Sequence, residues 1–359
     1  MSPEVSRYPE ITVSGSPREL GRQIGDAVGD QVRAFCEIAL ERVNKTAAVS
    51  RSEAEAIAGR CLEFTRDYNS PLIDELEGTA EASGVPLMDL MLLQVRNQLT
   101  AEEEAGCTSV ALPTGVVAQN WDNDPELDPF TIVLTRHPTD RPSLTTLTQA
   151  GLIAYIGFND RGLGACLNTL PAPTRSHGVP HYFTLRDLYE QSSLDDAIAS
   201  ITRATRAIPA NIILSTPQGP ADLEVTVEDV HVLRPEPGTR LTHTNHCLHP
   251  ELLPINDRFP ELIQSYSRKQ RVDTLVSDAA PPAPKNNKTD STHLASIKAA
   301  LRDHDGHPKS ICRHPNDDPA TGFWTTVFSV IIEPDELRMH VTRGTPCDRP
   351  YEIYTMTPR

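Results

Sequence analysis

Apolar residues recur at helical spacing through the N-terminal third of the chain. Residues 16–19, Ser-Pro-Arg-Glu, read as a capping box with proline at the first helical position. The positions that follow lie on one face of a helix: Leu20, Ile24, Val28, Val32 and Phe35. A second capping signal at residues 52–55 predicts another helix. A third helix is expected from Pro71 to near Gly84. Residues 86–100 continue the helical pattern.

From residue 107 onward the pattern changes to short apolar runs separated by turns. The runs predicted as strands are 130–134, 143–147, 164–168, 212–214, 225–227, 230–233, 325–333 and 336–342. Helices are expected at residues 180–191, 194–205 and 292–302, and the Pro-, Asn- and Lys-rich stretch 277–291 is expected as a surface loop. Antiparallel hairpins flanked by helices predict an α+β sandwich.

Composition narrows the class of protein. The chain has 359 residues, 38% of them hydrophobic, which is enough for a sizeable core. A net charge of −16 without clustered Lys and Arg argues against nucleic-acid binding, and weakly favours a cationic amine as substrate. The start of the chain lacks a secretory signal, and no apolar run approaches the roughly 18 residues that span a membrane. We therefore expect a cytoplasmic protein that does not bind membranes.

The seven cysteines lack the paired CxxC spacing of zinc or redox sites, so most are expected to be reduced and buried. One alternative is a metal site in the segment that contains His243, His246, Cys247 and His249, because imidazole and thiolate are zinc ligands. The same segment follows a β-type run, and we expect no metal site there.

The sequence Gly106-Cys107-Thr108-Ser109 stands where the helical third meets the β-rich remainder. An apolar run follows Cys107, turns at residues 113–115 and returns toward Asp122, so a hairpin is expected to bring Asp122 beside the start of the first strand. One interpretation is a buried core cysteine. The other is a nucleophile released by cutting the Gly106–Cys107 bond, since a free α-amino group has a pKa of about 7.7–8.0 and can take the proton of its own thiol.

Landmarks along nearly the whole chain resemble the acyl-coenzyme A:isopenicillin N acyltransferase family of self-cleaving N-terminal-nucleophile hydrolases. They are residues 75–78 with 84–86, 106–109, 119–122, 157–159, 185–186, 243–247 and 310–313. This resemblance implies an αββα sandwich and cleavage at Gly106–Cys107. The products would be a helical fragment, 1–106, and a nucleophile-bearing fragment, 107–359, which together form one domain and stay associated.

The resemblance also implies roles for individual residues. Cys107 would be the nucleophile with its own α-amine as base, and Asn245 would donate to the oxyanion. Asp122 matches a carboxylate near the new amino terminus, where it would orient the ammonium; the alternative is a turn or strand-end aspartate. Ser109 matches a hydroxyl that assists cleavage, or is a strand serine.

The chain departs from the family pattern at two positions. Phe323 stands in the segment where the penicillin-pathway enzyme carries an arginine, and Ala105 stands where that enzyme has an aspartate before the cut. Arg186 or Arg313 would have to replace that cation, although each also fits a structural ion pair. We expect Trp121, Arg186, Arg313 and Phe323 to be substrate-contacting or structural residues.

The expected reaction is formation of an acyl-thioester on Cys107 from a small N-acyl amine or peptide-like amide, followed by attack of water. The alternative is an acyltransferase that moves an acyl group from a coenzyme A thioester to an amine, and a non-enzymatic scaffold is a third class. No cofactor is expected beyond coenzyme A thioester as a co-substrate. Beyond the heterodimer of its own two fragments, association into a higher oligomer stays open.

Overall fold

The computed structural model describes residues 7–44, 47–99, 106–277, 291–318 and 322–358. Its helices are α1 (Pro17–Val43), α2 (Arg51–Ser83), α3 (Leu87–Gln94), α4 (Arg96–Leu99), α5 (His181–Leu188), α6 (Leu194–Thr202), α7 (Leu253–Asn256), α8 (Ser265–Ser277) and α9 (Ser291–Leu301), with short 3-10 turns η1 (Pro125–Phe130) and η2 (Pro334–Glu336). Its strands are β1 (Glu10–Gly15), β2 (Cys107–Ala111), β3 (Val117–Asn123), β4 (Thr131–Pro138), β5 (Leu144–Gln149), β6 (Ile156–Asn159), β7 (Gly164–Asn168), β8 (Ala210–Ser215), β9 (Ala221–Val225), β10 (Val230–Leu233), β11 (Leu241–His243), β12 (Thr325–Glu333), β13 (Arg338–Arg343) and β14 (Glu352–Thr355).

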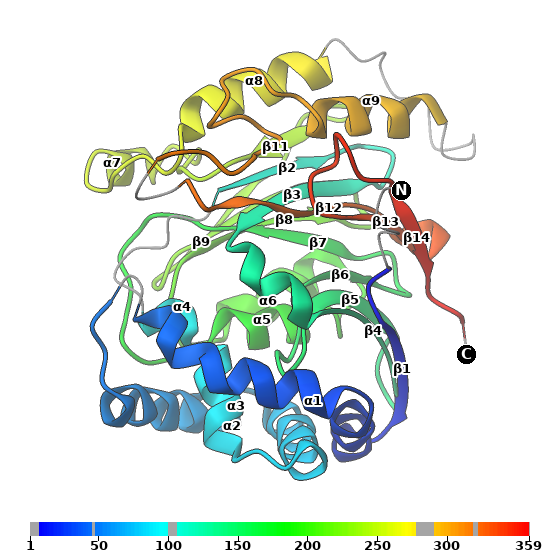
Figure 1. Ribbon diagram of the computed structural model, residues 1–359. Coiled ribbons are helices and arrows are strands. Elements are labelled where there is room, and N and C mark those ends of the chain that lie inside the picture. The colour runs from blue at the N-terminus through cyan, green and yellow to red at the C-terminus, as the bar shows by residue number, and fades with distance from the viewer. Residues whose placement is uncertain (1–6, 45–46, 100–105, 278–290, 319–321, 359) are drawn as a thin grey trace, which may run out of the picture.

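Two stacked sheets form the middle of the molecule, and helices cover both outer faces (Figure 1). Within the described residues, one sheet has eight strands in the order β1-β4-β5-β6-β7-β8-β9-β10 and the other six in the order β11-β2-β3-β12-β13-β14. Helices α8 and α9 lie over the six-stranded sheet, and α1–α4 lie beneath the eight-stranded one (Figure 1). The expected αββα sandwich is confirmed.

The N-terminal helices are longer than the sequence pattern indicates. In α1 the carboxylate of Glu19 accepts a hydrogen bond from the backbone N–H of Ser16, as the capping box predicts. The second and third expected helices are one element, α2, which bends at Asn69 just before Pro71 and begins after an N-cap at Ser50 rather than at Ser52. Proline tolerates this position because the bend removes the clash that it would cause in a straight helix.

The eight-stranded sheet joins the two sides of the expected cleavage site. Its edge strand β1 precedes the site and pairs in parallel with β4, which follows it. Strand β1 was not expected from the sequence, because a lone edge strand before a long helix has no hairpin partner nearby in the chain. The pairing ties the residues before the expected cleavage site into the sheet by backbone hydrogen bonds.

The six-stranded sheet carries the hairpin predicted at residues 107–122. Strands β2 and β3 pair antiparallel, with Cys107 opposite Trp121. Side chains of β2 alternate between the space between the sheets, where Cys107 and Ala111 lie, and the face under α8 and α9, where Val110 packs. The expected surface loop at 277–291 lies almost entirely outside the described residues.

Helix α8 was not expected from the sequence. Figure 1 shows it lying above β2 and β11, where its residues contact both strands. Across the described part of the chain, no helix combines the length and the apolar character needed to cross a membrane.

Candidate active site around Cys107

Strand register brings the candidate residues to one end of β2. Cys107 is the first residue of β2, and β3 on one side places Trp121 opposite it. On the other side β11 pairs antiparallel with β2, with His243 opposite Ser109. Because the strands are antiparallel, the residue two positions after His243 lies beside Cys107, and this residue is Asn245.

Asn245 contacts the backbone of Cys107 directly. The N–H of Cys107 donates to Oδ1 of Asn245 at 2.9 Å. The side-chain amide of Asn245 donates to the carbonyl of Thr169 at 3.0 Å, which fixes which end of the amide is oxygen. Both Cys107 and Asn245 are buried. The amide is thus held with its oxygen toward the Cys107 backbone and one of its N–H groups bound to Thr169.

Arg268 on α8 is a site residue that was not expected from the sequence. Its guanidinium donates to the carbonyl of Cys107 at 2.7 Å, to Oγ1 of Thr108 at 3.0 Å and to Oδ1 of Asn245 at 2.8 Å. The side chain is buried, and burial lowers its pKa. A buried cation so fully hydrogen-bonded fixes the backbone of Cys107 and the orientation of Asn245 together.

Asp122 lies on the face of the sheet toward the helices, beside Gly106. Its Oδ1 accepts a hydrogen bond from Thr326 at 2.6 Å, while Oδ2 is buried without a hydrogen-bond partner among the described residues. Burial raises the pKa of this carboxyl to about 6, although Arg268 acts to lower it. A carboxylate with a pKa near neutrality and one unused oxygen can accept a proton at physiological pH.

Gly106 sits against this carboxylate. Its carbonyl accepts a hydrogen bond from the backbone N–H of Asp122 at 2.9 Å. A Cβ at this position would lie 3.2 Å from Oδ2 of Asp122 and 3.4 Å from Ile263. The absence of a Cβ at Gly106 therefore allows both the backbone N–H and the carboxylate of Asp122 to lie close to the peptide group before Cys107.

Ser109 supports Asn245 through a third residue. The hydroxyl of Ser109 donates to Oδ1 of Asn168 at 2.5 Å. The amide of Asn168 in turn donates to the carbonyl of Thr244 at 2.9 Å, immediately before Asn245. This chain of hydrogen bonds links β2, β7 and the end of β11.

The buried pair of His243 and Glu224 also holds the turn that carries Thr244 and Asn245. Nδ1 of His243 donates to the carbonyl of Thr244, and its Nε2 lies 2.9 Å from Oε1 of Glu224. Burial acts to lower the pKa of His243, but Asp222 and Glu224 outweigh burial and raise it. Both ring nitrogens of His243 thus face oxygen acceptors, which leaves the ring no lone pair for a metal.

The remaining candidates have structural surroundings. Arg186 bonds to Glu75 and Glu190, within the helical layer. Arg313 is buried beside the Asp122 carboxyl, and its Nε donates to the carbonyl of Trp324 at 3.1 Å. These two arginines are thus held by protein groups.

The two aromatic candidates differ in burial. Trp121 is stacked on Phe328 and makes an edge contact with Tyr155 between the sheets. Phe323 is 43% exposed and packs edge-on against Trp324. Ala105 lies outside the described residues. Arg268 donates a hydrogen bond to the backbone of Cys107, whereas Arg186 is bonded to Glu75 and Glu190.

Within the described residues, His243, His246, Cys247 and His249 do not form a group of converging ligand atoms. His246 instead lies 2.7 Å from Oγ of Ser265, and burial lowers its pKa to about 4. These four residues therefore do not converge as one ligand set, although His249 belongs to a separate group with His231 and Glu251 whose ligand atoms all lie within 4.8 Å of one another.

Comparison with known proteins gives a family match. A model of the family described as acyl-coenzyme A:6-aminopenicillanic acid acyl-transferase matches residues 111–348, beginning just after Cys107. A relative from Emericella nidulans, acyl-coenzyme A:6-aminopenicillanic-acid-acyltransferase 40 kDa form, is 26% identical and aligns with 97% of this chain and 95% of its own length.

Solved structures with similar chains include two bacterial enzymes. Penicillin V acylase from Agrobacterium tumefaciens is 11% identical, with a TM-score of 0.40, and covers 66% of this chain and 82% of its own. A variant of conjugated bile acid hydrolase from Clostridium perfringens is 12% identical, with a TM-score of 0.44, and covers 70% of this chain and 97% of its own.

Proposed function

The chain belongs to the acyl-coenzyme A:6-aminopenicillanic acid acyl-transferase family, and from this premise we propose that it cuts itself at Gly106–Cys107 and then uses Cys107 as an N-terminal nucleophile on small amides. The observation that carries the proposal is the enclosure of the Cys107 backbone. Its N–H is bound by Asn245 and its carbonyl by Arg268. A merely structural cysteine needs neither a buried amide nor a buried guanidinium at its own peptide groups.

Self-cleavage begins with attack of the Cys107 thiol on the carbonyl carbon of Gly106. The carbon–nitrogen bond breaks, the thiol proton ends on the departing nitrogen, and a thioester joins Gly106 to the cysteine sulfur. The backbone N–H of Asp122, 2.9 Å from the carbonyl oxygen of Gly106, stabilises the oxyanion that forms there. Water then hydrolyses the thioester, which leaves a carboxylate on Gly106 and a thiol with a free α-amine on Cys107.

Asp122 is the base for this hydrolysis. Its unused Oδ2 faces Gly106, and its pKa of about 6 leaves it mostly ionised at neutral pH. The carboxylate accepts a proton from the attacking water. After the cut, the same carboxylate lies near the new ammonium and favours its charged form.

Turnover repeats the chemistry on a substrate. The α-amine of Cys107 accepts the thiol proton, the sulfur attacks the acyl carbon of an N-acyl amine, and the amine leaves with that proton. The second N–H of the Asn245 amide stabilises the oxyanion, while Arg268 holds Asn245 in place through Oδ1. Water releases the acyl group as a free acid.

Acyl transfer is the second candidate, and the Emericella relative supports it, because the name of that protein specifies an acyl-coenzyme A donor. In that case an amine rather than water resolves the thioester on Cys107. A hydrolase releases free acid from an amide with no thiol cofactor present. Strict dependence of product formation on an acyl-coenzyme A would favour the transferase.

Intact mass under denaturing conditions tests the proposal before any substrate is known. Wild-type protein should give two fragments that meet at 106/107, and Cys107→Ala should give one uncut chain. A matched control is Cys166→Ala, which removes a buried thiol from neighbouring β7 and should still be cut. An uncut wild-type chain after prolonged incubation, or cutting in Cys107→Ala, would refute the proposal.

A further inference from the structure

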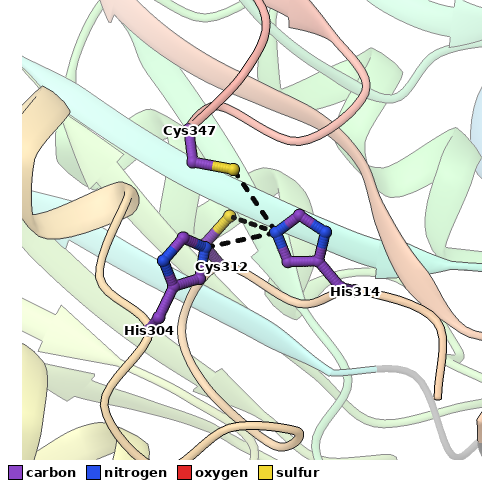
Figure 2. A group of neighbouring side chains, drawn as sticks. All are labelled: His304, Cys312, His314 and Cys347. Atoms are coloured by element: carbon purple, nitrogen blue, oxygen red, sulfur yellow. Dashed lines mark hydrogen bonds between the residues drawn. The ribbon is translucent and has the colours of Figure 1, made fainter.

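Four potential metal ligands meet where the segment before β12 packs on strands β3 and β12 of the six-stranded sheet. They are His304, Cys312, His314 and Cys347 (Figure 2). The first three lie in the segment between α9 and β12, and Cys347 lies in the turn after β13. Their ligand atoms all lie within 4.8 Å of one another. Cys312 is buried, His314 half-buried, and the other two are exposed.

Hydrogen bonding does not account for this arrangement. Three contacts converge on Nε2 of His314: Nε2 of His304 at 3.2 Å, the sulfur of Cys347 at 3.3 Å and the sulfur of Cys312 at 3.7 Å (Figure 2). An imidazole nitrogen has one proton or one lone pair in the ring plane, so it makes one good hydrogen bond. A shared cation explains why four side chains point to one place.

The separations fit a tetrahedral zinc ion. Zinc lies about 2.3 Å from a thiolate sulfur and about 2.0–2.1 Å from an imidazole nitrogen, so tetrahedral geometry sets the nitrogen atoms about 3.3 Å apart and nitrogen and sulfur about 3.6 Å apart. The distances of 3.2, 3.3 and 3.7 Å around Nε2 of His314 are close to these values. Two thiolates also neutralise the charge of the ion, which suits a partly buried position.

We propose that His304, Cys312, His314 and Cys347 bind a zinc ion. Thiolate and imidazole are the ligands that zinc prefers, and four protein ligands leave no open position for water or substrate. The site is therefore structural rather than catalytic, and it does not depend on whether the chain cuts itself. This proposal replaces the expectation from cysteine spacing that the chain holds no metal.

The ion would fasten the segment that lies behind Asp122. Arg313 stands between two of the ligands, and its backbone N–H donates to Oγ1 of Thr326 at 2.9 Å. Thr326 in turn donates to Asp122. The carbonyl of Ile311, next to Cys312, accepts a hydrogen bond from Asn120 in β3 at 2.9 Å. Zinc binding would thus hold this segment on β3 and β12 and tie it to the turn that carries Cys347.

Metal analysis of the full-length, untagged protein tests the proposal. We expect about one zinc ion per chain, either as purified or after addition of zinc to the reduced protein, and a Co²⁺-substituted form with the absorption bands of tetrahedral thiolate ligation. The variants Cys347→Ser and His304→Ala should lose most of the bound metal. Both residues are exposed, so these variants are expected to fold, which circular dichroism checks.

Matched controls are Cys36→Ser and His307→Ala, which alter a cysteine and a histidine outside the cluster and should retain the metal. The proposal is overturned if the reduced protein binds neither zinc nor Co²⁺ with these properties, or if the two ligand variants bind as much metal as the controls. A disulfide between Cys312 and Cys347 would make the purified chain about two daltons lighter than expected. If that mass is found, and both cysteines occur in one crosslinked peptide that persists in metal-loaded protein, the cluster is a disulfide rather than a zinc site.

Discussion

Removal of the Thr326 hydroxyl should shift the pH dependence of self-cleavage. Thr326 donates a 2.6 Å hydrogen bond to Oδ1 of Asp122, whose pKa is about 6. A hydrogen bond to a charged group contributes about 1.5–3 kcal/mol, which corresponds to about 1–2 pKa units at 1.36 kcal/mol per unit. Loss of a bond that favours the ionised form raises the pKa, so Thr326→Val should titrate Asp122 at about 7–8.

This shift gives a measurable change in rate. The ionised fraction of Asp122 at pH 7 falls from about 90% to about 10–50%, and cleavage that requires the carboxylate should slow by about two- to tenfold. Above about pH 9 the variant should approach the wild-type rate, because Asp122 is ionised in both. The assay follows precursor made by translation in vitro, moved into buffers from about pH 5 to pH 9 and separated on denaturing gels.

Thr325→Val is the matched control, since the Thr325 hydroxyl donates to the carbonyl of Arg313 at 2.9 Å rather than to Asp122. Its pH profile should follow that of the wild type. The reasoning is refuted if Thr326→Val cuts with the wild-type profile, or if it slows equally at every pH, which would indicate a distorted site rather than a shifted pKa.

Two further substitutions test the surroundings of the site and the sheet. Gly106→Ala should slow cleavage, because the new Cβ would lie 3.2 Å from Asp122 Oδ2 and would push the carboxylate from its place by a few tenths of an ångström. Gly59→Ala, whose Cβ would meet one atom at 3.8 Å, should cut normally in the same gel assay. For Glu333→Gln we expect a loss of about 2–3 kcal/mol in unfolding free energy at pH 7, since hydrogen bonds led by that of His340 outweigh burial and lower the Glu333 pKa to about 2. The lost stabilisation is present above about pH 4.5 and fades as pH falls toward 2, so urea titrations that show an equal loss at all pH values would contradict the assignment.

Local patterns were enough to predict the hairpin at the site. The apolar runs on either side of residues 113–115 set the pairing of β2 with β3, so Cys107 and Asp122 were expected together from the residues alone. Asn245 was different, because 138 residues separate it from Cys107 and only the family resemblance pointed to it. Local sequence carries no information about which distant strand completes a sheet edge.

Arg268 could not have been found in this way. Its helix, α8, reads Ser-Tyr-Ser-Arg-Lys-Gln-Arg at its start, a sequence typical of a solvated surface, and mean hydropathy gives no sign of burial. Tertiary contact with β2 overrides that local character and buries the guanidinium. The zinc ligands escaped notice for a related reason, since the fourth, Cys347, is 33 residues from His314 and no paired motif links them.

The long sequence separation within the site has a consequence for the timing of maturation. Asn245 and Arg268 lie 138 and 161 residues after Cys107, so a ribosome must finish most of the chain before the cysteine backbone is enclosed. Under the proposed mechanism, a nascent, truncated or misfolded chain therefore stays whole and inert. The cut would then act as a checkpoint, and the ratio of fragments to precursor in a cell would report the fraction of molecules that had completed folding.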